Sequence, residues 1–235
     1  MRVPASLLLL ASLAACGTMR VGEPRFTVVT VDPLRESLQL FLNDEHGRPY
    51  KRLERVAAAL GRRGQHLSFG MNAGMYHADH SPVGLLVADG VELSPLNLSP
   101  GKGNFFLRPN GVFLVTDAGA QVVESSAYPA LASKARLATQ SGPMLLLNGV
   151  INPLFDPDSH SVHVRNGVCA MDGKAVFVIS EGRVNFYEFA RYFRDVLKCR
   201  NALYLDGSVS SLYSPALGRN DYRADLGPMI GVIAN

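Results

Sequence analysis

Apolar residues alternate with polar ones, or run in short blocks, along most of the chain, a pattern typical of β-strands. The alternation predicts strands at residues 25–33 and 36–44, and a third within 66–76 that ends in a glycine-punctuated loop. An apolar run at 201–205 predicts a short buried strand. Strands should therefore make up most of the fold.

Four short turn signals separate pairs of apolar runs and predict β-hairpins. Asp-Gly and Asn-Gly favour type I′ turns, because both central residues of such a turn need a positive φ. The predicted turns are Asp89-Gly90, Asn110-Gly111, Asn148-Gly149 and Glu181-Gly182.

Helical spacing occurs in two places only. Residues 50–64 carry apolar side chains three and four apart, and Gly61 is placed to end that helix. Residues 186–199 form the clearest helix, with an aromatic stripe that is best interpreted as core packing. We therefore expect an α+β fold, a single hairpin-rich domain of largely antiparallel sheets with a few packed helices.

Composition supports a folded domain and argues against one class of partner. Of the 235 residues, 47% are apolar, which is enough to build a core, and only 18% are charged. The formal net charge is +3 and no basic run stands out, so we expect no nucleic-acid partner.

The first residues, MRVPASLLLLASLAAC, have the pattern of an export signal. Arg2 precedes an apolar stretch that is too short to span a bilayer. The segment Leu13–Cys16 resembles a bacterial lipobox, which implies cleavage before Cys16 and lipidation of that cysteine; the alternative is a plain secretory signal with a coincidental cysteine. We therefore expect a signal peptide at 1–15, a tether at 16–25, a domain at 26–235, and a protein exported and lipid-anchored in the bacterial cell envelope.

Two further cysteines, Cys169 and Cys199, allow two interpretations. An envelope location permits a disulfide between them, but two buried free thiols are slightly favoured. No CxxC pattern is present, and His77 and His80 lack an obvious third zinc ligand. We expect no cofactor and no metal site among the functional residues, and leave a structural cation open.

Polar side chains beside glycine follow four apolar stretches, and each is also typical of an ordinary turn. An arginine fork suits phosphate, amides suit sugar hydroxyls, and a carboxylate can assist catalysis. The serines could bond to a ligand or to the carboxylate. A serine hydrolase that uses Ser210 or Ser211 stays formally open, although the chain has no G-x-S-x-G elbow. The four stretches, in order, are "GMNAGMY" with Asn72 and Gly74, "TQSGP" with Gln140, "RNG" with Arg165, and "DGSVSS" from Asp206 to Ser211.

In this order the four stretches resemble the motifs of the phosphodiester glycosidase family, which includes the lysosomal uncovering enzyme. The closer resemblance is to the family's bacterial branch of envelope proteins, and it covers roughly residues 66 to 235. Ser208 departs from the pattern, because the family has glycine in the middle of the last motif.

The resemblance implies hydrolysis of the bond between a sugar's anomeric carbon and a phosphodiester oxygen, in a surface glycan or a nucleotide-sugar-like substrate. It implies Asp206 as the catalytic carboxylate and Arg165 as a phosphate clamp. The alternative is a non-catalytic lipoprotein of the same fold that binds glycan or phosphate. The expected substrate-binding residues are Asn72, Gly74, Gln140, Gly207, Ser210 and Ser211.

Overall fold

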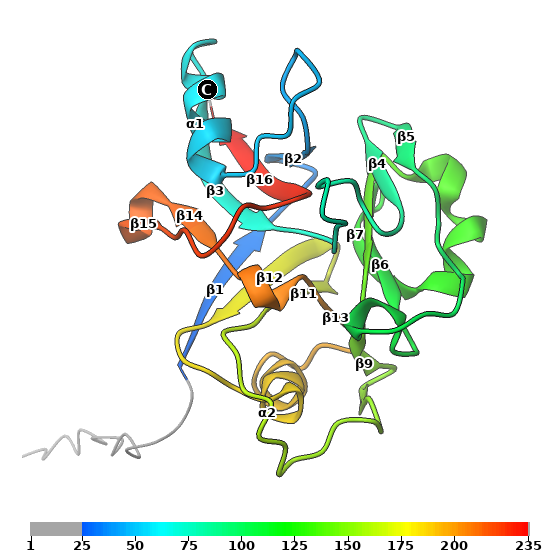
Figure 1. The fold of residues 1–235 in the computed structure, drawn as a ribbon. Coiled ribbons are helices and arrows are strands. Elements are labelled where there is room, and N and C mark those ends of the chain that lie inside the picture. The colour runs from blue at the N-terminus through cyan, green and yellow to red at the C-terminus, as the bar shows by residue number, and fades with distance from the viewer. Residues whose placement is uncertain (1–24, 235) are drawn as a thin grey trace, which may run out of the picture.

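Three antiparallel sheets form most of the molecule (Figure 1). The structure is a computed structural model and describes residues 25–234. The predicted signal peptide, the lipidation of Cys16 and all but the end of the tether lie outside these residues. Within the described residues, the predominance of antiparallel sheets over helices agrees with the expected fold class.

The first sheet has six strands and occupies the middle of Figure 1. It contains strands from the predicted segments at 25–33 and 201–205, and from the apolar run before Glu181-Gly182. In spatial order the strands are β1 (Phe26–Val31), β12 (Lys174–Ser180), β11 (Asn166–Met171), β13 (Ala202–Tyr204), β9 (Met144–Leu147) and β10 (Val150–Ile151).

Two five-stranded sheets flank the first one. The second sheet runs β15 (Arg219–Asn220), β14 (Leu212–Ser214), β3 (His66–Asn72), β16 (Met229–Ala234) and β2 (Ser37–Phe41). The third runs β5 (Val91–Ser94), β4 (Leu86–Ala88), β8 (Leu137–Ser141), β6 (Gly111–Thr116) and β7 (Gly119–Glu124). One apolar cluster joins all three sheets: Phe69 and Met71 of the second meet Phe177 of the first and Phe113 of the third.

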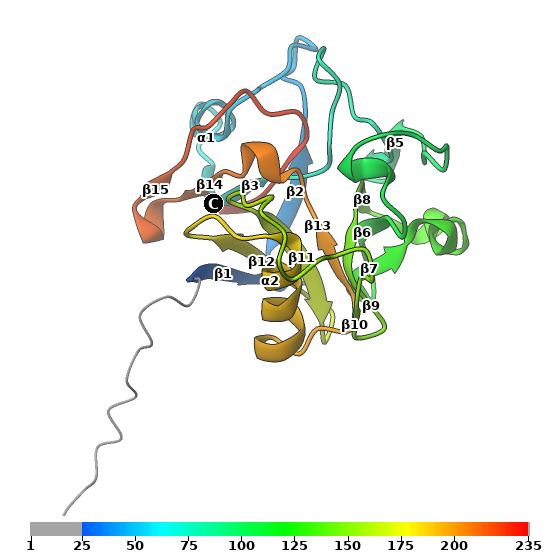
Figure 2. The same cartoon turned by 60° about the horizontal axis from the view of Figure 1, so that its bottom comes forward.

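Two helices cover the outer faces of sheets. Helix α1 (Leu53–Gly61) ends at the predicted glycine and packs on the second sheet. Helix α2 (Phe186–Arg191) continues into one π-helical turn at Tyr192–Val196 and packs on the first sheet, as Figure 2 shows. Its aromatic stripe is buried there, as predicted. Among the described residues no helix is both long and apolar enough to cross a membrane.

Two of the four predicted hairpins are confirmed. Asp89-Gly90 joins β4 to β5 and Asn148-Gly149 joins β9 to β10, and all four residues have positive φ. The backbone geometry is therefore the one that these residue pairs favour.

The other two predicted hairpin turns are wrong. Asn110 is buried and donates to the Phe105 carbonyl, and Gly111 is the first residue of β6 rather than a turn residue. The chain after Glu181-Gly182 enters α2 instead of returning as a strand. β12 forms its hairpin with the preceding strand, β11, and the turn between them is Asp172-Gly173.

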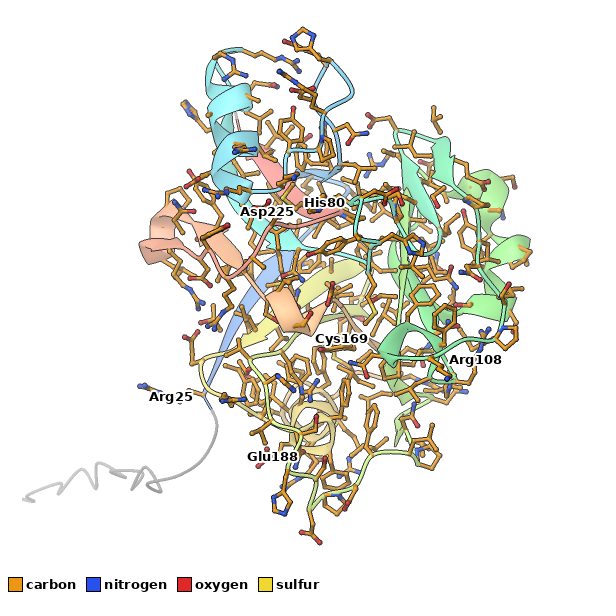
Figure 3. All side chains as sticks on the ribbon, in the orientation of Figure 1. Arg25, His80, Arg108, Cys169, Glu188 and Asp225 are labelled. Atoms are coloured by element: carbon orange, nitrogen blue, oxygen red, sulfur yellow. A yellow bond between two sulfur atoms is a disulfide. The ribbon has the colours of Figure 1, made fainter. Side chains whose placement is uncertain are left out.

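Cys169 and Cys199 form a disulfide, so the expectation of two free thiols is wrong. Cys169 lies in β11, where Figure 3 labels it, and Cys199 follows the turn after α2. Packing of α2 on the sheet brings the two Cα atoms to 6.3 Å, within the range that a disulfide needs. The sequence spacing of the two cysteines could not predict the disulfide, because they come together only when α2 packs on the sheet.

Candidate functional site

The end of β3 and the Asp206 turn are joined directly. Asn72 Nδ2 donates to the Asp206 carbonyl oxygen at 2.5 Å, and Asn72 Oδ1 accepts from the Ser211 N–H at 2.9 Å. The Asp206 N–H donates to the Ala73 carbonyl at 3.1 Å. Two stretches that lie more than a hundred residues apart in sequence therefore form one structural unit.

Asn166, which follows Arg165, joins the same network. Its Nδ2 donates to the Asn72 carbonyl at 3.0 Å, and its Oδ1 accepts from Ser210 Oγ at 2.9 Å. The Ser211 hydroxyl donates to the Val209 carbonyl. All of these side chains are buried. They hold the backbone of three motifs together, so Asn72, Ser210 and Ser211 support the site from below.

Gly74 and Gln140 meet through the backbone. The Gly74 N–H donates to Thr139 Oγ1 at 3.2 Å, and a Cβ at Gly74 would lie 2.4 Å from the Gln140 carbonyl oxygen. Glycine is needed here because β8 leaves no room for a side chain.

The Gln140 side chain does not reach Asp206. It is buried, and both of its amide atoms are bound to protein groups away from the turn. Its Oε1 accepts from the N–H groups of Leu85 and Asn97, and its Nε2 donates to the Asn97 carbonyl and Ser125 Oγ. In the structure this side chain therefore joins the two ends of the β4–β5 hairpin, at Leu85 and Asn97, whereas a sugar contact was expected.

Arg165 is buried, with 1% of its surface exposed. Its Nε donates to the Val184 carbonyl at 2.9 Å and its Nη2 to the Ser161 carbonyl at 2.8 Å. Its Nη1 donates to the Tyr204 hydroxyl at 3.2 Å, and the Phe186 ring lies 3.7 Å from its Cζ. Burial lowers the pKa of the guanidinium, which still stays protonated at neutral pH. In this structure the arginine presents no open fork, unlike the expected phosphate clamp.

Asp206 is the half-buried carboxylate to which these segments lead. Ser208 Oγ donates to its Oδ1 at 3.0 Å, so the serine in place of a glycine supports this carboxylate. In the described part of the chain no arginine, lysine or histidine forms an ion pair with it. Burial raises the pKa of this carboxyl, more than the hydrogen bonds from Ser208 lower it.

Two tyrosines beside Asp206 were missed by the sequence reasoning. Burial, with a smaller contribution from the Asp206 charge, raises the pKa of Tyr204 and of Tyr76 to about 12, so both stay protonated. Tyr76 donates to the Asp225 carbonyl and stacks on His80, and Figure 3 labels the last two residues. Alternation could have indicated Tyr204, since it lies two positions before Asp206 in an extended stretch.

Gly207 is required by its neighbour rather than by its backbone angles. A Cβ at this position would lie 2.0 Å from the Tyr204 hydroxyl oxygen. The Asp-Gly pair therefore places a carboxylate directly before the one residue that can pack over this hydroxyl.

A separate hollow of about 530 Å³ lies between β2 and α1. It is lined by Phe41, Tyr50, Leu60 and Arg63, among others, and by none of the predicted site residues. We place the candidate site at Asp206 because the shifted ionisable groups gather there. Among residues 25–234 no group of three His, Cys, Asp or Glu side chains is arranged to hold a metal ion.

Comparison with known proteins gives one family and a set of relatives. The family model described as phosphodiester glycosidase matches residues 65–232. The uncharacterized protein YigE of Escherichia coli (strain K12) is 38% identical over 196 residues, which cover 82% of this chain and 76% of that protein.

Solved structures share the fold at low sequence identity. The zebrafish N-acetylglucosamine-1-phosphodiester alpha-N-acetylglucosaminidase catalytic domain, solved auto-inhibited by its pro-peptide, has a TM-score of 0.59 at 14% identity, covering 89% of this chain and 83% of that one. A hypothetical protein from Synechocystis has a TM-score of 0.56 at 14% identity, covering 90% and 59%. A Burkholderia pseudomallei K96243 protein that is predicted to be exported has a TM-score of 0.53 at 13% identity, covering 88% and 73%.

Proposed function

The chain belongs to the phosphodiester glycosidase family, and from this we propose that it hydrolyses the bond between a sugar's anomeric carbon and a phosphodiester oxygen. The substrate would be a surface glycan or a nucleotide-sugar-like molecule. Asp206 is the proposed catalytic carboxylate.

The observation that carries this proposal is the state of Asp206. Its carboxyl is half-buried, its pKa is raised by that burial, and no cation pairs with it among the described residues. A structural carboxylate is usually bound by a cation or by several N–H groups, which lower its pKa. A carboxylate placed at a turn that the end of β3 and the Asn166 stretch hold in position is instead typical of a group that does chemistry.

The reaction needs only one carboxylate. A glycosidase usually protonates a poor leaving group with a second acid, but a phosphate ester leaves as a stable anion. Water forms the new bond to the anomeric carbon while the bond from that carbon to the phosphate oxygen breaks, and its electron pair stays on phosphate. Asp206 accepts the proton of the water and returns it to solvent.

The position of Arg165 suggests a supporting role for its charge. The N–H groups of Arg165 are bound to protein oxygens, one of which is the Tyr204 hydroxyl. The cation is buried, and charges interact strongly in a buried environment. We propose that this charge favours the anionic phosphate from a distance. Gly207 is buried, so the exposed backbone at its neighbour Ser208 would form the surface on which the substrate lies.

The disulfide supports an exported location. Such bonds persist in oxidising compartments and are rare in the cytosol. We therefore propose that the protein works outside the cytoplasm, anchored at the envelope through a lipid on Cys16.

The test is release of sugar from UDP-N-acetylglucosamine or a related sugar-1-phosphodiester by the purified protein. Asp206→Asn should lower kcat/KM by about 10²- to 10⁴-fold. Asp195→Asn is the matched control, because Asp195 is exposed and pairs only with Arg191 and Arg194. Unchanged turnover in Asp206→Asn would refute the assignment, and binding without turnover in the unmodified protein would favour the glycan-binding alternative.

A serine nucleophile finds little support in the geometry. Ser210 and Ser211 are buried, and their hydroxyls donate to carbonyl oxygens and to Asn166. No histidine is among their described hydrogen-bond partners.

A further inference from the structure

Arg165 is a buried cation that has only neutral partners. Its three bonded N–H groups go to two carbonyl oxygens and the Tyr204 hydroxyl, and its flat face covers the Phe186 ring. No carboxylate lies within ion-pair distance of it in the described part of the chain. A buried charge is costly unless it is compensated, so the position of the nearest anion matters.

The strand register brings one carboxylate, Asp206, to the same end of the strand pair as Arg165. β11 and β13 pair antiparallel, with Gly167 opposite Tyr204, and the Leu205 N–H still donates to the Asn166 carbonyl. Continued beyond the paired residues, the same register would bring Arg165 opposite Asp206, where the Asp206 N–H already donates to the Ala73 carbonyl of the second sheet. Such cross-strand neighbours could form a direct ion pair. They do not, because the guanidinium turns toward Tyr204 and α2.

Tyr204 contacts the cation and lies two residues before the carboxylate in the chain. Tyr204 and Asp206 are two residues apart in extended backbone, so their side chains lie on the same face. The hydroxyl oxygen accepts from Arg165 Nη1 at 3.2 Å, and Gly207 packs so closely against it that a Cβ there would lie 2.0 Å away. The hydroxyl's own proton must point away from Arg165, and no hydrogen-bond acceptor for that proton is found among the described residues.

We propose that Tyr204 is a positioning residue that couples the buried Arg165 to Asp206 and helps to keep this carboxylate ionised. The hydroxyl accepts from the cation and directs the positive end of its O–H dipole toward the carboxylate. Hydrogen bonds in such a chain strengthen one another in a buried environment. The meaning of this coupling for catalysis rests on the proposed function, but the coupling itself does not.

Other ionisable groups lie near Asp206 or Arg165, and apart from Tyr204 and Arg165 the variants used in a test should leave these residues unsubstituted. Each comes from an element packed against the Asp206 turn or against Arg165. They are Tyr76 from the segment after β3, with Asp225 behind it, Tyr204 from β13, and Arg165, with His163 and Arg183 beyond it.

The experiment is a titration of the Asp206 carboxyl by NMR in the full chain with ¹³C-labelled aspartate and no substrate, the signal being assigned by its loss in Asp206→Asn. Tyr204→Phe and Arg165→Met should each move the midpoint upward, by about 0.5 to 1 pH unit. The double variant should move it no further than the larger single change, because both remove the same coupling.

Arg165→Lys tests the route of the coupling. It keeps the charge but loses the fork that reaches Tyr204, so it should shift the midpoint as Arg165→Met does. Phe186→Leu is the control, since it removes packing on Arg165 and Tyr204 without removing a hydrogen bond. It should lower the Tm and leave the midpoint unchanged.

Two results would overturn the proposal. One is a midpoint that stays constant in Tyr204→Phe although that variant is folded. The other is an Arg165→Met shift of the same size with and without Tyr204→Phe, which would mean that the charge acts directly through space. Neither readout needs turnover, so a failure of the proposed hydrolysis would be recognised separately, in the sugar-release assay.

Discussion

Single residues in the Asp206 turn have roles that residue type alone does not reveal. Gly207 has an ordinary backbone conformation, and what excludes other residues is the Tyr204 hydroxyl in the space of a Cβ. Ser208 replaces a glycine of the family pattern and bonds to Asp206. Asn72 was predicted to bind the substrate, and in the structure its amide joins the end of β3 to the Asp206 carbonyl and the Ser211 N–H. Burial, which the sequence gives only coarsely, decides between these roles.

Gly207→Ala should destabilise the protein by about 1–3 kcal/mol, because the new methyl group overlaps the Tyr204 ring and hydroxyl. Equilibrium urea unfolding measures the change. Gly182→Ala is the control, since a Cβ there meets nothing within 4 Å, and it should be neutral within about 0.5 kcal/mol. Equal stability of the two variants would contradict the packing that we describe.

Asp206→Asn should make the protein more stable at neutral pH. Burial raises the pKa of Asp206 above that of the unfolded chain, so the folded state holds this proton more tightly. Its contribution to stability is therefore fully present below the unfolded pKa and is lost as the pH rises through the folded pKa. Asparagine cannot ionise, so the variant does not lose this stability as the pH rises.

The difference in Tm between Asp206→Asn and the unmodified protein should be larger at pH 7 than at pH 3. Thermal unfolding at both pH values measures it. The comparison cancels the carboxyls whose pKa is lowered, such as Asp44 and Asp225, because both proteins contain them. A difference that is the same at both pH values would mean that Asp206 titrates as it does in the unfolded chain.

At the scale of elements, α2 connects the sheet to the site. Asn185 caps the helix: its side chain accepts from the Glu188 N–H at 2.8 Å, and the Glu188 carboxylate accepts from the Asn185 N–H. Asn185 Nδ2 also donates to the Pro157 and Ser159 carbonyls. The cap thereby holds the segment whose Ser161 carbonyl binds Arg165.

Asn185→Ala should cost about 1–2 kcal/mol, because it removes the cap of α2. It should also loosen the segment around Ser161, so amide hydrogen exchange there should become faster. Asn220→Ala is the control, since Asn220 is exposed and has no side-chain hydrogen bond in the described structure. Slower or unchanged exchange in the 157–161 segment would show that the segment is held by other contacts.

Across the whole molecule, what the sequence predicted best were local patterns. The strands near the N-terminus, the two helices and two Asp/Asn-Gly turns follow from residues close together in the chain. The wrong turn at Asn110 arose because tertiary contacts bury that side chain under the 105 loop. The meeting of Asn72 with Asp206 was predicted from motifs and the burial of Arg165 was not, since burial depends on how three sheets and α2 pack.

The disulfide acts at the scale of the whole fold. Cys169 and Cys199 are 30 residues apart in sequence, and the loop that they close contains β12 and α2. Closing a loop of this length should stabilise the folded state by about 3 kcal/mol, mainly by restricting the unfolded chain.

Unfolding in urea with a thiol reductant should therefore have a clearly lower midpoint than unfolding without it. A double variant, Cys169→Ala with Cys199→Ala, should unfold near the urea midpoint of the reduced protein, and reductant should not change its midpoint. Both sulfurs are buried, so the bond is reduced mainly when the chain opens, and samples must be equilibrated in urea before measurement. If thiol labelling confirms complete reduction and the midpoint is unchanged, the α2 packing rather than the covalent link holds this part of the fold, because the cluster around Phe189 and Phe193 would then suffice alone.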